Sequence, residues 1–292
     1  MVSALLDADV IRELEVLRKR ARARVRSVSA GERTSRRRGA SAEFREHRPY
    51  ASGDDPRRID WAAYARTGEP VMKLFAADED VIVRLVVDTS ASVGALGSAK
   101  LRAAQRVAAA IGYLALASAE RAQIVVANEG LERAHEPARG RSSLPKLLTA
   151  LDALEPRGGT DLARAVEDTL GRARSPGILA IVSDFLDGGP WDHAVTRAAA
   201  AGHEIVLVQV LADEELEPPW DGDFELEDAE TGEIVEITVS PEALQAYETE
   251  LRANFARLRD VASRARAAYV RTSPSEPICA AMRRVVAREV QA

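Results

Sequence analysis

Five stretches of continuous apolar residues alternate along the chain with segments whose apolar positions recur at helical spacing. A strand without polar alternation is buried on both faces, which is typical of a parallel sheet covered by helices. The pattern therefore predicts an α/β fold with a doubly wound, mostly parallel sheet. The predicted strands are residues 81–88, 122–127, 177–184, 203–211 and 267–272. The predicted helices are residues 100–119, 142–154, 160–173, 191–201, 241–266 and 276–290.

Two segments depart from this alternation. Apolar residues at helical spacing predict an N-terminal helix over residues 4–28, and the Arg-, Gly-, Ser- and Pro-rich residues 29–70 are expected to be irregular. Residues 224–228 and 234–239 flank a turn and predict a β-hairpin, which we expect to be an insertion on the edge of the sheet. The predicted domains are an N-terminal helix and arm over 1–78 and an α/β domain over 79–292, with its insertion at about 213–240.

Composition limits the classes of partner. The net charge of −6 argues against nucleic acid as the main partner. Charge is unevenly spread, because basic residues dominate 12–48, whereas 213–236 is rich in acidic residues and has no basic one. Each run is read either as a partner surface or as a solvated segment. A single cysteine, Cys279, excludes an intramolecular disulfide and a zinc site built from several cysteines.

The distribution of apolar residues also bears on location. The longest apolar stretch, residues 108–119, is too short to span a bilayer. Acidic residues precede any apolar run at the N-terminus, unlike the order in a secretory signal peptide. We therefore expect a cytoplasmic protein that does not insert into a membrane.

Polar side chains cluster at the carboxyl ends of the predicted strands, where doubly wound sheets bind ligands. Asp88, Ser90 and Ser92 follow the first strand, and Asp184 ends the third. Thr160 follows a Gly-Gly turn at the start of a helix. Carboxylates and hydroxyls are hard oxygen ligands, which suit Mg²⁺, Mn²⁺ or Ca²⁺ and leave one position open to an outside group. The same residue types also occur at these places as helix caps.

These residues carry a resemblance to known families. The order Asp88-x-Ser90-x-Ser92, then Thr160, then Asp184 is similar to the metal-ion-dependent adhesion site of von Willebrand factor type A domains. Residues 43–75 resemble the signature of the bacterial domain of unknown function 58 (DUF58) family. The signature positions are Glu43, Phe44, Arg48, Tyr50, Gly53, Asp54, Asp55, Arg57, Ile59, Asp60, Trp61, Ala65 and Arg66.

The resemblance implies a von Willebrand factor type A-like domain that is an adaptor and not an enzyme. Family members are often associated with MoxR-type AAA+ ATPases. The resemblance also implies that the five oxygen-bearing residues hold a divalent cation. A Glu or Asp of the ATPase or its client protein would then fill the open coordination position of that cation. The arm is read either as a partner-binding surface or a lid at the metal site, or as a capped and ion-paired turn without such a role. The candidate partner-binding residues are Arg48, Asp54, Asp55 and Arg57.

Two other functions stay open. A metal-dependent phosphohydrolase of the haloacid dehalogenase type also has an Asp after its first strand, but it needs a second Asp where this chain has Ser90. It also needs a lysine near the later carboxylate, and none directly precedes Asp184. A scaffold with a vestigial metal site is the other alternative. The sequence lacks the phosphate loop of an ATPase and the glycine pattern of a dinucleotide-binding enzyme.

Overall fold

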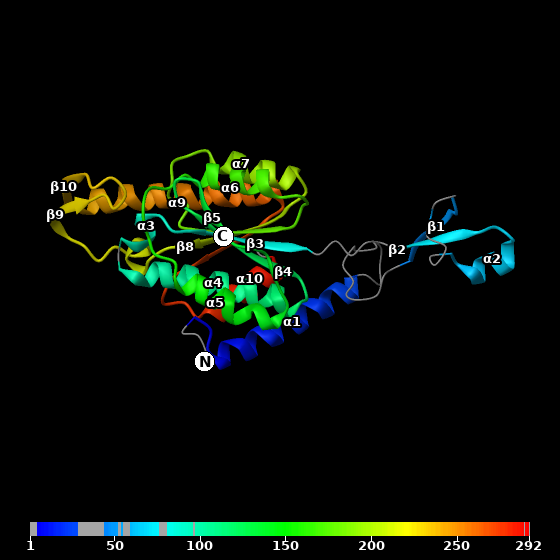
Figure 1. Cartoon of the computed structure of the whole chain (residues 1–292). Coiled ribbons are helices and arrows are strands. Elements are labelled where there is room, and N and C mark those ends of the chain that lie inside the picture. Colours follow the sequence, from blue (N-terminus) through cyan, green and yellow to red (C-terminus); the bar gives the residue numbers. More distant parts are fainter. Residues whose placement is uncertain are drawn as a thin grey trace. The chain divides into compact units, whose positions relative to one another are not determined.

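The computed structural model shows an α/β chain in two compact units (Figure 1). It describes residues 5–28, 44–51, 54, 59–75, 81–95, 97–288 and 290–291. One unit comprises Met1–Val25 and Val81–Ala292, and the other comprises Arg26–Asp80.

The larger unit is built around a seven-stranded sheet with the order β11-β8-β7-β3-β4-β5, in which the short β6 also pairs with β4. The four pairs from β11 to β4 are parallel, whereas β5 and β6 run antiparallel to β4. The predicted doubly wound, mostly parallel fold is therefore confirmed. The strands are β3 (Ile82–Asp88), β4 (Arg121–Ala127), β5 (Leu131–Ala134), β6 (Ala138–Arg139), β7 (Ile178–Ser183), β8 (Glu204–Val210) and β11 (Ala268–Thr272).

Helices cover both faces of this sheet (Figure 1). On one face the apolar core involves α1 (Ala8–Val28), α4 (Ser98–Ala117), α5 (Leu144–Asp152) and α10 (Ile278–Ala287). On the other face it involves α6 (Leu162–Arg172), α7 (Trp191–Ala200) and α9 (Pro241–Ala265). Three short helices complete the unit: α3 (Ala91–Gly94), the 3-10 helix η2 (Arg141–Ser143) and α8 (Asp213–Leu216).

The strand order places a topological switch point between β3 and β7. The chain passes from β3 to β4 on one side of β3 and then returns to β7 on its other side. Parallel sheets of this type bind ligands at the carboxyl ends of such a strand pair. Asp88 ends β3 and Asp184 directly follows β7, so both predicted carboxylates lie at this point.

The N-terminal helix belongs to the larger unit, which differs from the predicted division at 78/79. Leu14 and Leu17 of α1 are buried in the same core as α4. The Tyr113 hydroxyl of α4 donates a 2.6 Å hydrogen bond to Glu15 Oε1. The apolar stripe that predicted this helix therefore packs on the α/β core and not in a separate arm domain.

The smaller unit contains regular structure where the sequence predicts an irregular segment. Strands β1 (Phe44–Pro49) and β2 (Val71–Phe75) pair antiparallel, and α2 (Trp61–Thr67) lies between them in the chain. Asp60 caps α2 by accepting hydrogen bonds from the backbone of Ala62 and Ala63, both at 3.1 Å. The prediction was wrong here because these strands are short and one of them is mostly polar.

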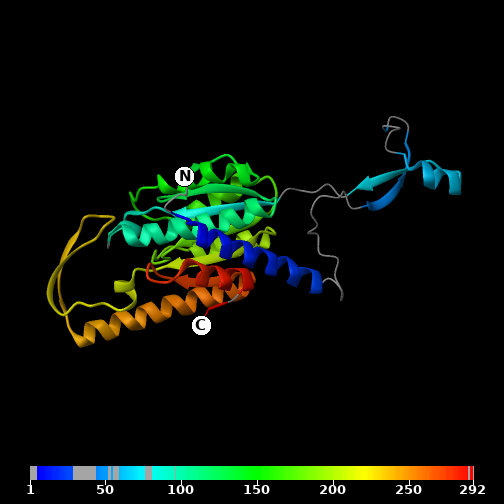
Figure 2. The same ribbon diagram turned by 90° about the horizontal axis from the view of Figure 1, so that it is seen from below.

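The predicted hairpin is present, but it does not extend the main sheet. Strands β9 (Gly222–Glu227) and β10 (Ile234–Val239) pair with each other in a two-stranded sheet of their own. Figure 2 shows the hairpin beyond the end of the unit at which α9 begins. Both strands are largely exposed, and this includes the apolar side chains of Leu226, Ile234 and Val235.

Among the helices in the part of the chain that the structure describes, none is both long enough and apolar enough to cross a bilayer.

Candidate metal centre

Asp88 is a buried carboxylate whose two oxygens are both held. Its Oδ1 accepts a 2.9 Å hydrogen bond from the backbone N–H of Ser90, and its Oδ2 accepts a 2.6 Å bond from the Ser183 hydroxyl. Burial and, next, the charge of Asp184 raise the pKa of Asp88 to about 6, against the lowering effect of these hydrogen bonds. The strand end thus concentrates negative charge in a place that water does not reach.

Ser90 and Ser92 are not helix caps in the hydrogen-bonding sense. Ser90 stands at the N-cap position of α3, but its side chain makes no capping hydrogen bond. Its hydroxyl oxygen lies 3.0 Å from that of Ser92 instead. The capping interpretation that the sequence left open therefore does not explain these two hydroxyls.

Thr160 is likewise not the cap of α6. Asp161 caps that helix by accepting a 2.8 Å hydrogen bond from the backbone of Arg164. The loop that carries Thr160 is fixed to the loop after β3, because Ala91 N donates to Gly158 O at 2.9 Å. The Thr160 hydroxyl donates a 2.7 Å hydrogen bond to Glu230 Oε1, in the turn of the β9–β10 hairpin.

Asp184 forms a buried ion pair with Lys100, which the sequence analysis missed. The Lys100 ammonium lies 2.7 Å from Asp184 Oδ2 and 2.6 Å from Glu215 Oε1, and the Lys100 and Asp184 side chains are each 2% exposed. Burial lowers the pKa of Lys100, but the two carboxylates outweigh it and hold that pKa above its ordinary value. The same ammonium donates a 3.4 Å hydrogen bond to the carbonyl oxygen of Ser92.

Three of the five predicted ligands are in direct contact, and a fourth is linked to them through Lys100. Asp88 accepts a hydrogen bond from the Ser90 backbone, and the Ser90 and Ser92 hydroxyls are in contact. The Lys100 ammonium bridges the backbone carbonyl of Ser92 and the Asp184 carboxylate. Thr160 reaches this cluster through the backbone of its loop.

The donor set fits a hard divalent cation. Each hydroxyl has one donor and two acceptor sites, so the Ser90, Ser92 and Thr160 oxygens can keep their hydrogen bonds and still offer a lone pair. Asp184 and Glu215 share the ammonium of Lys100, and the charge of Asp184 also acts on the neighbouring Asp88. Across the described ranges, His, Cys, Asp and Glu form no group of three or more that could hold a metal. Direct coordination would therefore depend on the hydroxyls.

The predicted partner-binding residues of the arm are only partly described. Arg48 and Asp54 form an ion pair at 2.7 Å, and Asp54 also accepts a hydrogen bond from Ala51 N. The hydrogen bond from Ala51 has the largest effect and lowers the pKa of Asp54, and the hydrogen bond from Arg48 lowers it further. Asp55 and Arg57 lie outside the described residues. A partner-binding role of these four residues stays a prediction.

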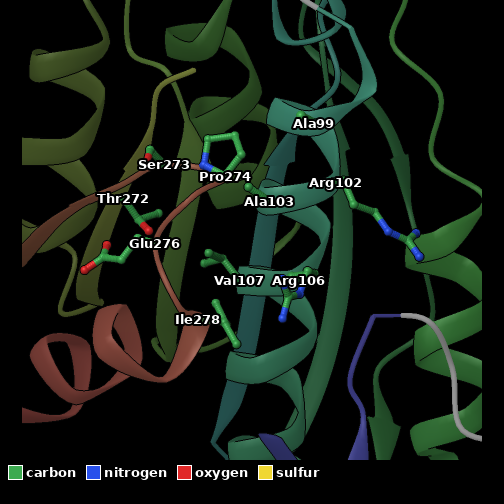
Figure 3. Close-up of a pocket in the computed structure, with 10 residues that line it drawn as sticks. All are labelled: Ala99, Arg102, Ala103, Arg106, Val107, Thr272, Ser273, Pro274, Glu276 and Ile278. Atoms are coloured by element: carbon green, nitrogen blue, oxygen red, sulfur yellow. The ribbon is translucent and has the colours of Figure 1, made fainter. Parts of the chain in front are cut away.

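A pocket lies between α4 and the segment that runs from the end of β11 to α10 (Figure 3). None of the five predicted metal ligands lines it. Its three charged residues are already engaged: Arg102 pairs with Asp152, Arg106 donates to the carbonyl of Leu5, and Glu276 pairs with Arg284.

The matches to known families agree with this architecture. The family described as "Protein of unknown function DUF58" matches residues 46–257, which is well over half of the chain. The chain belongs to the DUF58 family. An uncharacterised protein of Mycobacterium tuberculosis, Rv1480, is 37% identical over 209 residues, or 70% of this chain and 65% of its own length. The uncharacterised Mycobacterium bovis protein Mb1516 matches to the same extent, so this DUF58 chain spans less than two thirds of these relatives.

The chain also matches solved structures at low sequence identity. BatB from Bacteroides thetaiotaomicron is 15% identical, with a TM-score of 0.44, and the match covers 71% of this chain and 98% of that one. An aerotolerance-related membrane protein from Bacteroides fragilis is 13% identical, with a TM-score of 0.45 and coverage of 72% and 98%. The von Willebrand factor domain of the pilus tip protein Mfa5 from Porphyromonas gingivalis is 13% identical, with a TM-score of 0.31 and coverage of 71% and 85%.

The expected cytoplasmic location is corrected by these matches. The Bacteroides fragilis neighbour of this DUF58 chain is itself a membrane protein. A further neighbour, from Vibrio fischeri, is described as membrane-spanning. The prediction of a cytoplasmic location for this chain is therefore not kept.

Proposed function

We propose that this DUF58 protein is a non-enzymatic adaptor that binds a partner protein through a divalent cation. The observation that carries the proposal is the pair of Ser90 and Ser92 hydroxyls, 3.0 Å apart in the turn after Asp88, together with the loop of Thr160, whose Gly158 carbonyl is bonded to that turn. The side chains of Ser90 and Thr160 do not cap helices. Mg²⁺ is the cation that we expect, with Mn²⁺ or Ca²⁺ as substitutes, since all three prefer oxygen ligands.

The chemistry of the centre suggests what the partner contributes. Hydroxyls are neutral ligands, so a cation bound mainly through Ser90, Ser92 and Thr160 retains positive charge toward solvent. Asp88 and Asp184 would act beside it, directly or through water. An acidic side chain of the partner would then complete the coordination. By resemblance to the family, we propose that this partner is a MoxR-type AAA+ ATPase or its client protein.

The first test is whether the cation binds the folded protein. A ligand that binds only the native state raises its stability, by about 2.7 kcal/mol at about 100 times its Kd. We expect Mg²⁺ to raise the melting temperature of the wild type and to have no such effect on Asp88→Ala. Equal behaviour of the two proteins would favour the scaffold with a vestigial site.

The second test is whether the cation matters for a partner. The wild type and the double variant Ser90→Ala/Ser92→Ala would be immobilised and exposed to a purified MoxR-type ATPase from the same organism. We expect capture by the wild type in Mg²⁺ and its loss in the double variant or in EDTA. Capture that is equal in all three conditions would contradict a role for the metal.

One observation favours a phosphohydrolase as the second candidate. Lys100 supplies, in space, the lysine beside the later carboxylate that the sequence does not place before Asp184. The general acid is still missing because Ser90 stands at its position, and Lys100 is enclosed by Asp184 and Glu215. We therefore expect no hydrolysis of p-nitrophenyl phosphate with Mg²⁺, and turnover that is lost in Asp88→Asn would establish the enzyme instead.

A further inference from the structure

Glu230 lies in the turn of the β9–β10 hairpin, yet its carboxylate is held at the candidate metal centre. Its Oε1 accepts a 2.7 Å hydrogen bond from the Thr160 hydroxyl, and its Oε2 accepts a 3.1 Å bond from the Thr160 backbone N–H. Both carboxylate oxygens therefore contact the one predicted ligand that does not come from the ends of β3 or β7.

The Glu230 carboxylate lies against the backbone of the glycine loop. A Cβ atom built on Gly159 would lie 3.4 Å from Glu230 Oε2, at van der Waals distance. The turn itself is organised by Asp228, whose Oδ1 accepts hydrogen bonds from the backbone of Glu230 and Thr231, both at 2.8 Å. An Asx-type turn of this kind fixes the direction in which the next residues point.

Charge makes the position of Glu230 unusual. No arginine or lysine in the part of the chain that the structure describes forms an ion pair with it. The neighbouring carboxylate of Glu129 accepts a 3.4 Å hydrogen bond from Gly159 N, so two anions meet the same glycine loop. Two carboxylates directed at one loop are stabilised when a cation lies between them.

We propose that Glu230 is a ligand of the cation supplied by the chain itself, and that the hairpin closes the position which an acidic partner side chain would take. This inference rests on the proposed function, because it requires a cation at the hydroxyl cluster. The Thr160 hydroxyl can donate its proton to Glu230 while a lone pair faces the cation. An acidic side chain of a partner must then displace Glu230 from the cation. The free energy of that displacement weakens partner binding.

The test uses Mn²⁺ as the probe, because its paramagnetism reports both binding and the number of coordinated waters. The full chain is compared with Glu230→Gln and with Glu233→Gln, which removes the same charge from the same turn and is also exposed. Loss of a ligand should weaken Mn²⁺ binding by about tenfold to a hundredfold in Glu230→Gln. We expect the control to stay within about twofold of the wild type, since its charge acts only through screened solvent.

A second measurement separates coordination from charge and from folding defects. Water-proton relaxation by the bound Mn²⁺ should be stronger in Glu230→Gln than in the wild type, because a water takes the vacated position. Added acetate should reverse that increase in the variant and change little in the wild type. An equal acetate response in both proteins would show that the position is already open, and the inference would be wrong.

The outcomes distinguish this inference from the proposed function. If the wild type binds Mn²⁺ and the two glutamate variants behave alike, Glu230 is not a ligand, but the metal-dependent adaptor survives. If the wild type binds no Mn²⁺, both proposals fall. Binding that weakens in Glu230→Gln alone, with the acetate-sensitive water, supports both.

Discussion

The Lys100 ammonium lies 2.7 Å from the Asp184 carboxylate, and both side chains are almost completely buried. Moving both charges of an ion pair out of water costs free energy. The pair is kept because one buried charge without its partner would destabilise the protein still more. Glu215 adds a second carboxylate to Lys100, at 2.6 Å. The pair thus connects the first turn of α4, the end of β7 and α8 around the candidate metal centre.

Replacing Lys100 by methionine should strongly destabilise the protein. The change leaves Asp184 and Glu215 without their cation, and removal of one partner from a buried pair costs about 3–5 kcal/mol. Urea unfolding of Lys100→Met at neutral pH measures this loss. The control is Arg102→Ala on the same helix, whose ion pair with Asp152 is partly exposed and should be worth less than about 1 kcal/mol. Equal stability of the two variants would mean that Lys100 is not buried with its carboxylates.

The hydroxyls of Ser90 and Ser92 should matter for the cation and little for the fold. The double change to alanine removes their 3.0 Å contact, and a hydrogen bond of this kind contributes about 1 kcal/mol. We expect the rise in melting temperature with Mg²⁺ to vanish. Ser240→Ala provides the opposite control, because Ser240 caps α9 by accepting a hydrogen bond from Ala243 N. That variant should lose about 1 kcal/mol and keep its full response to Mg²⁺.

Helix α1 should behave as part of the α/β core. Leu14 is 0% exposed, so Leu14→Ala should cost about 2–5 kcal/mol through lost burial and a residual cavity. Val16 on the same helix is 49% exposed, and Val16→Ala should change the free energy of unfolding by less than about 0.5 kcal/mol. Thermal and urea unfolding of the full chain compare the two. A small effect of Leu14→Ala would return α1 to the arm, as the sequence analysis had placed it.

The sheet and most of its helices were predictable because a doubly wound fold leaves a direct pattern in the sequence. The segment VIVRLVVD can be buried on both faces only between layers of helices, and its terminal Asp88 falls at the ligand-binding edge by topology alone. The five oxygen-bearing residues were proposed from the same pattern, and their role as metal ligands stays a prediction. Each of them can be recognised from the strand end or loop that carries it, without knowledge of its partners elsewhere in the chain.

The residues that the sequence analysis missed depend on partners far away along the chain. Lys100 stands in an Ala-rich helix, where a lysine is normally a solvated residue, and its partner Glu215 is 115 residues away. Glu230 lies in a run of acidic residues that is typical of a solvated loop, and Thr160 is 70 residues away from it. Only the tertiary structure brings these side chains together. The strands of the smaller unit were missed for another reason, since their pattern is too short and too polar to distinguish from a loop.

Ser183 should tune the candidate centre without contacting the cation. Its hydroxyl donates to Asp88 Oδ2 at 2.6 Å and accepts a 3.0 Å hydrogen bond from Phe185 N. Ser183→Ala leaves a buried carboxylate oxygen without its donor, so we expect a loss of about 1–3 kcal/mol in stability. Because Asp88 is then less well oriented, Mn²⁺ binding should weaken by about tenfold or more. Thr169→Ala is the matched control, since it removes a buried hydroxyl that bonds only to Ala165 O within α6. Isothermal titration with Mn²⁺ measures the affinity of both variants. A similar affinity in the two would show that the Ser183 hydroxyl does not orient Asp88 toward the cation.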